Sequence, residues 1–399
     1  MAVEIRHPCG VPAHAAVRAQ VPVTRAGPPS GARASRPGRV RGHIRPATVR
    51  RRTVKSIDTD MLNPDAFDEV IDVRSPSEFA EDHIPGAINL PVLNDAQRAE
   101  VGTLYKQVSA FEARRLGAGY ISDNIGGHLA RHFSDKPASY APLIYCWRGG
   151  QRSQSMAHIL ERVGWPVALL AQGYKTYRRL VRNELEVLPQ RVRFHVLAGY
   201  TGTGKTKILH ALAKRGAQVF DLEGLANHQG SLLGEPPQGQ NVSQKWFESQ
   251  LWDALRGFDP ARPVWTEAES AKIGQVSLPK HVLHSVRGGT TFEIVAEREE
   301  RARFLSSGYR WWRENPDVLM GKLQRLTERY GQAEIDRWQA LADARDWPGF
   351  VGRVLEMHYD PAYARSRGKN YATASVQVHV EGLLEAGADQ AADRLLSTT

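Results

Sequence analysis

Residues 191–216 read RVRFHVLAGYTGTGKTKILHALAKRG, and this stretch decides the fold of the second half of the chain. An apolar run, FHVLA, is followed by G-x4-G-K-T and then by apolar residues at helical spacing. The order of strand, glycine-rich loop and helix predicts a P-loop in a parallel α/β sheet. The residues expected to hold a diphosphate in this loop are Gly199, Thr201, Gly202, Gly204, Lys205 and Thr206.

Each part of the P-loop has its own expected role. Backbone N–H groups cradle the phosphate oxygens, Lys205 neutralises their charge, and Thr206 ligates Mg²⁺. A P-loop recognises a diphosphate that carries a metal ion, while the group attached to the diphosphate is bound elsewhere. The motif alone therefore leaves open whether the ligand is ATP.

Acidic residues end two further strand-like runs in this half. Because side chains of a strand alternate with a period of two, QVFDLE places Asp221 and Glu223 on one face, and PVWTEAE does the same for Glu267 and Glu269. These carboxylates are candidate Mg²⁺ ligands or substrate contacts. The alternative is that they cap turns or form ion pairs. His228, in LANHQGS, is a further candidate substrate contact.

The first half of the chain shows the same alternation of strands and helices. Apolar strands EVIDV, PLIYC and PVALLA are separated by turns and helical patterns, and a basic helical pattern, YKTYRRLVRNEL, follows the third strand. Such alternation predicts a parallel α/β sheet. We therefore predict a disordered basic extension over 1–55, a first α/β domain over 56–188, and a P-loop domain over 189–399 with a largely helical C-terminal part.

The chemical motif of the first domain is CWRGGQRS, from Cys146 to Ser153, placed between a strand and a helix. Paired glycines let backbone N–H groups turn inward as an anion-binding nest, which the helix N-terminus reinforces. A thiol held there ionises readily, and the thiolate is the attacking species. Arg152, with Arg148 assisting, is expected to close the loop over a tetrahedral oxyanion. The alternative is that Cys146 is only a buried core cysteine.

Composition narrows the function classes. Residues 1–55 contain eleven arginines and Lys55 but one acidic residue, whereas 56–399 contain 41 basic and 42 acidic residues. The basic excess thus lies in the extension, which is a neutral addition or, alternatively, a nucleic-acid-binding arm or targeting peptide. Two cysteines without C-x-x-C spacing exclude a disulfide framework and favour the cytoplasm. No apolar run is long enough for a membrane span.

Residues 57–180 resemble the rhodanese family, on IDVRSPSEF, HIPGAINLP and the cysteine loop. Rhodaneses carry sulfur on cysteine as a persulfide. The resemblance implies structural roles for Asp72, Arg74, Glu78 and His83. The longer loop here, with C-x5-R spacing, is also similar to that of related phosphatases, so a larger oxyanion is a natural ligand.

The two loops together resemble the tRNA 2-selenouridine synthase family over about 57–368. The resemblance also includes VGTLYKQ, AFEARRLGA, GYKTYR, DLEGLANHQGS, VWTEAESAKIG and YDPAYARS. Gln172 and Gln229 stand where we expect that family to have glycine and a basic residue.

This second resemblance implies a transferase that replaces sulfur with selenium in 5-substituted 2-thiouridine at the wobble position of tRNA. Selenophosphate is the implied selenium donor, and geranyl diphosphate is an implied co-substrate that gives an S-geranylated intermediate. The P-loop, with Mg²⁺, would hold the diphosphate of the geranyl donor. The cysteine loop would hold selenophosphate, and Cys146 would take the selenium as a mixed persulfide.

Three other functions fit the residues. They are an ATP-dependent rhodanese-type sulfurtransferase acting on tRNA, a C-x5-R phosphatase fused to a kinase, and a nucleotide-gated tRNA-binding protein with an inactive cysteine loop. The intact Cys146 and Arg152 argue against the last.

The surface that would contact tRNA has a weaker signal. GYRWWRE mixes cations and rings, so it suits base stacking or an amphipathic core helix. A basic run suits phosphate contacts or a solvated helix face, and its residues are Lys175, Arg178, Arg179 and Arg182. The oligomeric state and the set of tRNAs have no signal in the sequence.

Overall fold

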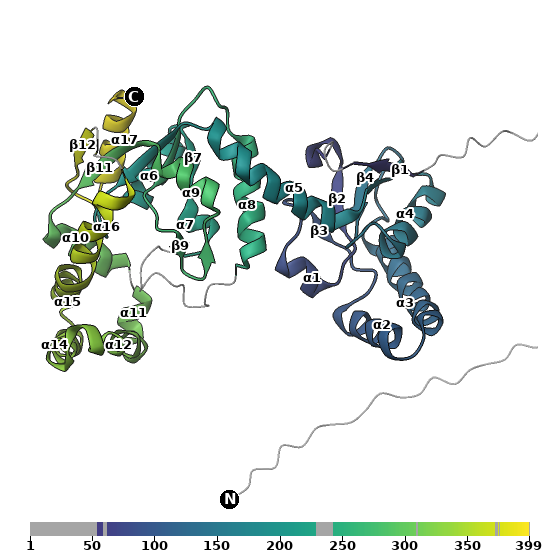
Figure 1. Ribbon diagram of the computed structural model, residues 1–399, viewed down its shortest axis with the longest axis horizontal. Coiled ribbons are helices and arrows are strands. Elements are labelled where there is room, and N and C mark those ends of the chain that lie inside the picture. Colours follow the sequence, from purple (N-terminus) through teal and green to yellow (C-terminus); the bar gives the residue numbers. More distant parts are fainter. Residues whose placement is uncertain are drawn as a thin grey trace, which may run out of the picture. The chain divides into compact units, whose positions relative to one another are not determined.

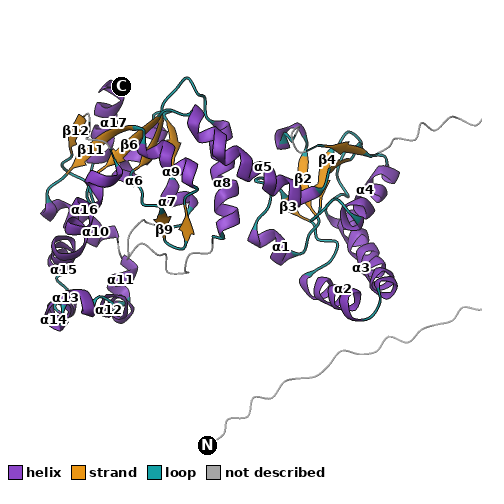
Figure 2. Cartoon of the chain, in the orientation of Figure 1, coloured by secondary structure: helices purple, strands orange, loops and turns teal. Residues whose placement is uncertain are grey.

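The structure of this chain is a computed structural model that describes residues 54–58, 62–228, 242–308, 310–371, 374 and 376–398. The basic extension up to residue 53 lies outside these ranges, as does Gln229. Figure 2 shows helices arranged around separate β-sheets in the described part. The predicted parallel α/β fold is confirmed, because every strand pairing in both five-stranded sheets is parallel.

The first sheet has the strand order β1-β5-β4-β2-β3. Its strands are β1 (Lys55–Ile57), β2 (Glu69–Asp72), β3 (Ile88–Asn89), β4 (Pro142–Tyr145) and β5 (Ala168–Leu170). Because side chains alternate along a strand, Val70 and Leu143 enter one core while Ile71 and Ile144 enter the other. Both faces of this sheet are covered, which explains why its central strands read as continuous apolar runs.

The helices around the first sheet lie between or after its strands along the chain. They are α1 (Pro76–Glu81), α2 (Asp95–Gln107), α3 (Ala110–Arg131), α4 (Gln151–Val163) and α5 (Gly173–Val187), with short 3₁₀ turns at Pro64–Ala66 and Leu188–Arg191. The Asn94 side chain accepts from the backbone of Gln97 at the start of α2, and Ser109 accepts from Phe111 at the start of α3.

The second sheet has the strand order β12-β11-β6-β8-β7. Its strands are β6 (Phe194–Ala198), β7 (Gln218–Phe220), β8 (Val264–Glu267), β11 (Thr290–Val295) and β12 (Val376–His379). A small antiparallel hairpin joins β9 (Lys272–Ile273) and β10 (Val276–Ser277). The helices of this part are α6 (Lys205–Lys214), α7 (Leu222–Leu225), α8 (Gln244–Gly257), α9 (Lys280–Arg287), α10 (Arg298–Gly308) and α17 (Gly387–Thr398).

Between β11 and β12 the chain forms a helical region with its own core (Figure 1). Its helices are α11 (Arg310–Glu314), α12 (Pro316–Gln324), α13 (Thr327–Tyr330), α14 (Gln332–Asp343), α15 (Trp347–Val354), a π-helical turn (Leu355–Tyr359) and α16 (Asp360–Asn370). Trp338 and Phe350 lie at the centre of this core, and Trp311 packs against it. For Trp311, the core role is therefore the one that the structure shows.

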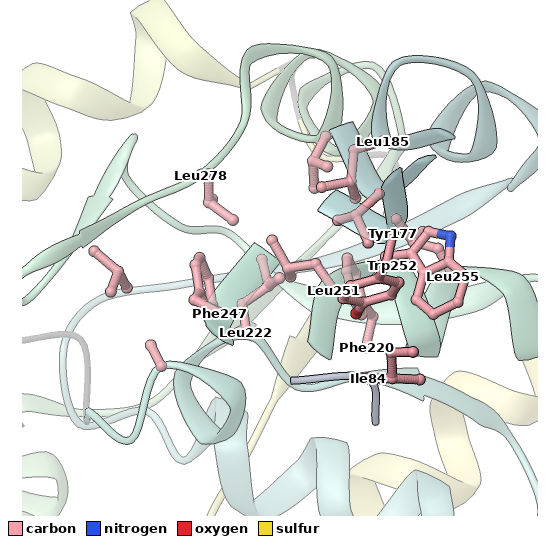
Figure 3. Packing of buried hydrophobic residues seen from close by; sticks show 14 of the residues in the cluster. Ile84, Tyr177, Leu185, Phe220, Leu222, Phe247, Leu251, Trp252, Leu255 and Leu278 are labelled. Atoms are coloured by element: carbon pink, nitrogen blue, oxygen red, sulfur yellow. The ribbon is translucent and has the colours of Figure 1, made fainter. Parts of the chain in front are cut away.

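Helix α5 packs on the first sheet and also contacts α8. Figure 3 shows Tyr177 and Leu185 of α5 close to Leu251, Trp252 and Leu255 of α8. The Tyr177 and Trp252 rings meet edge to face, with centroids 5.6 Å apart. None of the helices in the described ranges is both long and apolar enough to cross a bilayer.

Two candidate active-site loops

The P-loop connects β6 to α6 with the geometry that its glycines permit. Gly199, Gly202 and Gly204 have positive φ angles of 154°, 85° and 79°. A Cβ atom on Gly199 would lie 2.5 Å from the Ile294 carbonyl oxygen on the neighbouring strand β11. Side chains are thus excluded where the backbone must turn, and the loop leads into the N-terminus of α6 at Lys205.

The expected cation and hydroxyl of this loop face a group of carboxylates. Lys205 Nζ donates to the carbonyl oxygens of Gly199 and Tyr200 at 3.1 and 3.4 Å. Thr206 Oγ1 donates to Glu223 Oε2 at 3.2 Å. Oxygen atoms of three carboxylates lie within 4.8 Å of one another, and these belong to Glu223, Glu267 and Glu269.

Glu267 and Glu269 are buried and Glu223 is half-buried beside them, and this perturbs the ionisation of all three carboxylates. Burial, followed by repulsion from Glu269, raises the pKa of Glu223 to about 8. Burial and Glu223 raise the pKa of Glu267 to about 8, and burial and Glu267 raise the pKa of Glu269 to about 7. The attraction of Lys205 opposes each shift without cancelling it.

This cluster fits a divalent cation on a separate observation. Glu267 is 2% exposed, and its Oε1 has no hydrogen-bond partner among the described residues. A buried carboxylate oxygen without a partner is costly, and hard divalent cations prefer oxygen ligands. Glu223, Glu267 and Thr206 could therefore hold Mg²⁺ beside the phosphate loop.

Two other expected contacts of this half have different surroundings. Asp221 caps α7 by accepting from the backbone of Gly224 at 2.8 Å, and it also bonds His210 at 2.9 Å. For Asp221 the capping role is therefore observed. His228 is half-buried, and its backbone N–H donates to the Glu223 carbonyl at 3.0 Å. Neither residue belongs to the carboxylate cluster.

An arginine that was not predicted from the sequence contacts the backbone of the P-loop. Arg301 of α10 is 4% exposed and donates to the Thr201 carbonyl oxygen at 3.1 Å. It also forms a bidentate pair with Asp360 at 2.9 and 2.8 Å, and its guanidinium lies 5.1 Å from the centre of the Tyr200 ring. Asp360 lies in YDPAYARS, directly after the π-helical turn, so that motif was the available signal.

The cysteine loop connects β4 to α4 at the C-terminal edge of the first sheet. Cys146 is 3% exposed. The Ser153 hydroxyl, which is fully buried, lies 3.2 Å from Cys146 Sγ and donates to it. Gly149 has a φ of 65°, as a nest requires, and Gly150 caps α4. Sequence reasoning placed Ser153 in the motif but gave it no role; it is the hydrogen-bond donor to the sulfur.

The two arginines of the loop differ in their surroundings. Arg152 pairs with Glu78 of α1, with Nη1 2.7 Å from the carboxylate, so its guanidinium is held by a residue far away in sequence. This pairing and Ser75 keep the pKa of Glu78 low despite its burial. Arg148 is exposed and makes no ion pair within the described residues.

The predicted structural pair on the first sheet is confirmed. Arg74 and Asp72 are fully buried and joined by a bidentate bond, with the shortest N to O distance 2.6 Å. Arg74 also donates to the Asp82 carbonyl at 2.6 Å. His83 stacks between the rings of Phe79 and Trp246.

The first turn of helix α5 is hydrogen-bonded to the backbone of the cysteine loop. The backbone N–H groups of Tyr174 and Lys175 donate to the carbonyls of Cys146 and Trp147 at 2.9 and 3.0 Å. A Cβ on Gly173 would lie 2.1 Å from the Cys146 carbonyl oxygen, so only glycine fits there. The GYKTYR motif is thus the support of the reactive loop.

A cysteine loop supported in this way, followed in the same chain by a P-loop with a carboxylate cluster, defines a rhodanese-like domain joined to a P-loop domain. Residues 57–180 match the rhodanese-like domain family, and 192–393 match the tRNA 2-selenouridine synthase AAA domain family. The chain therefore belongs to the tRNA 2-selenouridine synthase family.

Two tRNA 2-selenouridine synthases and one solved structure are similar to this chain. A tRNA 2-selenouridine synthase of Hydrogenovibrio crunogenus is 36% identical over 326 residues, or 74% of this chain and 88% of that protein. One of Bdellovibrio bacteriovorus is 30% identical over 370 residues, or 80% of this chain and 95% of that protein. A solved rhodanese-related protein of Thermoplasma volcanium is 18% identical, covering 32% of this chain and 92% of that one, with a TM-score of 0.21.

Proposed function

We propose that this chain is a cytoplasmic transferase that replaces sulfur with selenium in wobble 5-substituted 2-thiouridine of tRNA. Selenophosphate is the proposed selenium donor, and the reaction passes through an S-geranylated intermediate made from geranyl diphosphate. The observation that supports this most is the presence, in one chain of this family, of a buried thiol with a hydroxyl donor and a separate loop built for a diphosphate.

The P-loop is proposed to run the geranylation step. The thiocarbonyl sulfur of the tRNA attacks the first carbon of the geranyl group, and the bond from that carbon to the diphosphate oxygen breaks. Lys205 and the loop N–H groups stabilise the departing diphosphate, because they bind it more strongly as its charge develops. Mg²⁺, held by Thr206 with Glu223 and Glu267, would supply further neutralisation of that charge.

The cysteine loop is proposed to run the selenium step. The N–H groups of the nest and Arg152 bind the phosphoryl oxygens, and the Cys146 thiolate attacks phosphorus, so that a sulfur–phosphorus bond forms as the phosphorus–selenium bond breaks and selenide leaves. Selenium enters C2 as selenide, geranyl thiol leaves, and water returns the phosphoryl group as phosphate. This exchange is redox-neutral, whereas the mixed persulfide expected from rhodaneses would also require a thiol reductant.

The proposal is tested by incubating the protein with 2-thiouridine tRNA, selenophosphate and geranyl diphosphate, followed by mass spectrometry of the nucleosides. Wild-type protein should yield 2-selenouridine, with S-geranyl-2-thiouridine as a transient. Lys205→Ala should suppress geranylation by a factor of about 100 or more because the diphosphate loses its cation. Product formation that requires ATP and consumes it stoichiometrically would replace this proposal with the ATP-dependent sulfurtransferase.

A further inference from the structure

The helical hairpin of α2 and α3 begins beside the cysteine loop. Ser77 of α1 donates its backbone N–H to Asp95 at the start of α2, with a distance of 3.0 Å. Arg98 of α2 lies 3.9 Å from Glu78, the residue that holds Arg152. The base of the hairpin is therefore tied to the residues that position the reactive loop.

The other end of the hairpin projects away from the sheet. Asn124 and His128 of α3 bond the carbonyls of Val92 and Pro91, which leave the sheet after β3. The residues of α3 before Asn124 thus span about 20 Å, at 1.5 Å per residue, and they pack against α2. Figure 1 shows α2 and the adjoining end of α3 lying to one side of the first sheet.

The tip of the hairpin carries large apolar side chains that the described part of the chain leaves exposed. Tyr105, Val108 and Phe111 are 60%, 70% and 63% exposed. They fall within seven consecutive residues at the turn between α2 and α3, so they gather at one end of the hairpin. Tyr105 belongs to VGTLYKQ and Phe111 to AFEARRLGA, motifs for which neither loop provides a role, and Val108 lies between the two motifs.

Cations lie between and beside these rings. Lys106 and Arg114 are exposed and make no ion pair within the described part of the chain, while Arg115 pairs with Glu112. Interleaved rings and cations suit unpaired nucleic-acid bases and phosphates, whereas the centres of protein interfaces are depleted in lysine.

A second set of cations lies on the other side of the reactive loop. Lys175, Arg179 and Arg182 occupy one exposed face of α5, which starts at the cysteine loop. They make no ion pair within the described residues, whereas Arg178 forms ion pairs with Asp82 and Glu248. The basic run is thus divided, and only its exposed members are available to phosphates.

We propose that the hairpin tip, formed by Tyr105, Lys106, Val108, Phe111 and Arg114, binds the RNA arm that carries the target nucleotide. Tyr105 and Phe111 stack on unpaired bases, and Lys106 and Arg114 contact phosphates, while the target base enters the cysteine loop. The α5 cations contact the backbone on the opposite side of the loop. This inference rests on the proposed function only in taking tRNA as the substrate.

The test measures affinity for 2-thiouridine tRNA and for its isolated anticodon stem-loop by fluorescence anisotropy. The double variant Tyr105→Ala, Phe111→Ala should weaken both by about 10-fold or more, because each stacked base contributes substantially to binding. Lys106→Ala should reduce the slope of log affinity against log salt concentration by about 0.7–0.9. The matched controls are Val163→Ala and Arg162→Ala, at the exposed end of α4 furthest from the loop, and they should leave affinity unchanged.

Activity separates this inference from the proposed function. For tRNA, the double variant should show a raised KM and an unchanged kcat. For a short 2-thiouridine oligonucleotide, its activity should equal that of the wild type. If the protein makes no 2-selenouridine but its RNA affinity still depends on the hairpin tip, the proposed function is wrong and the proposed RNA-binding surface is confirmed. Unchanged RNA affinity in the folded double variant would show that the hairpin tip does not bind RNA. Sedimentation showing a wild-type dimer that the double variant dissociates, with RNA affinity intact, would identify a contact between copies instead.

Discussion

The glycine at the start of α5 tests how the reactive loop is held. A Cβ on Gly173 would lie 2.1 Å from the Cys146 carbonyl oxygen, where ordinary contact begins near 3.4 Å. Gly173→Ala must therefore separate two backbone segments by more than 1 Å and break the 2.9 Å bond from Tyr174 to Cys146. The φ of 58° adds strain of about 1–2 kcal/mol for alanine. The lost hydrogen bond adds about 1 kcal/mol.

Alanine also lowers the conformational entropy of the unfolded chain, which offsets about 0.5–1 kcal/mol of this destabilisation. The expected net decrease in the free energy of unfolding is therefore roughly 2 kcal/mol. Urea unfolding followed by hydrogen exchange in β4 and α4 measures this loss locally. Selenium transfer should fall on the order of 100-fold, because a displacement near 1 Å misaligns the thiol. Diphosphate binding at the P-loop should not change. Wild-type stability together with wild-type selenium transfer would refute the view that α5 holds the loop.

Three further perturbations have clear expected outcomes. Gln172 adopts a φ of 55°, so Gln172→Gly should raise the free energy of unfolding by up to about 1 kcal/mol, and a decrease in urea midpoint would contradict the strain. Ser153→Ala removes the donor to Cys146 and should slow alkylation of the thiol by iodoacetamide by roughly 5–10-fold, whereas an equal rate would remove Ser153 from its role. Removing residues 1–53, which spares β1, should leave the melting temperature unchanged; a fall in tRNA affinity would instead reveal a binding arm.

The central strands and both loops were predictable because their signals are local. FHVLA and PLIYC are buried on both faces, so each reads as an apolar run, and the glycines of each loop follow at once. Edge strands carry less signal. In β12 only Val378 is buried, and β1 has three residues, of which Lys55 was assigned to the extension. Both strands are defined by their parallel pairing with β11 and β5.

Side-chain partners that are distant in sequence were not predictable. Arg152 was expected above the oxyanion, but nothing local indicates that Glu78 would position it. Arg301 and Asp360 are far apart along the chain, and in the folded protein their pair contacts the P-loop through the Thr201 carbonyl oxygen. The carboxylates were proposed separately from two strands, and the parallel order of β7 and β8 brings Glu223 beside Glu267.

The division of labour between the two loops is tested most directly by Cys146→Ser. Serine keeps the size and hydrogen bonding of cysteine but removes the thiolate. Given 2-thiouridine tRNA, geranyl diphosphate and selenophosphate, the folded variant should form and accumulate S-geranyl-2-thiouridine and make no 2-selenouridine. The measurement is the ratio of these nucleosides by mass spectrometry, with circular dichroism to verify folding. Normal selenation by the variant, or the loss of both products together, would contradict the account.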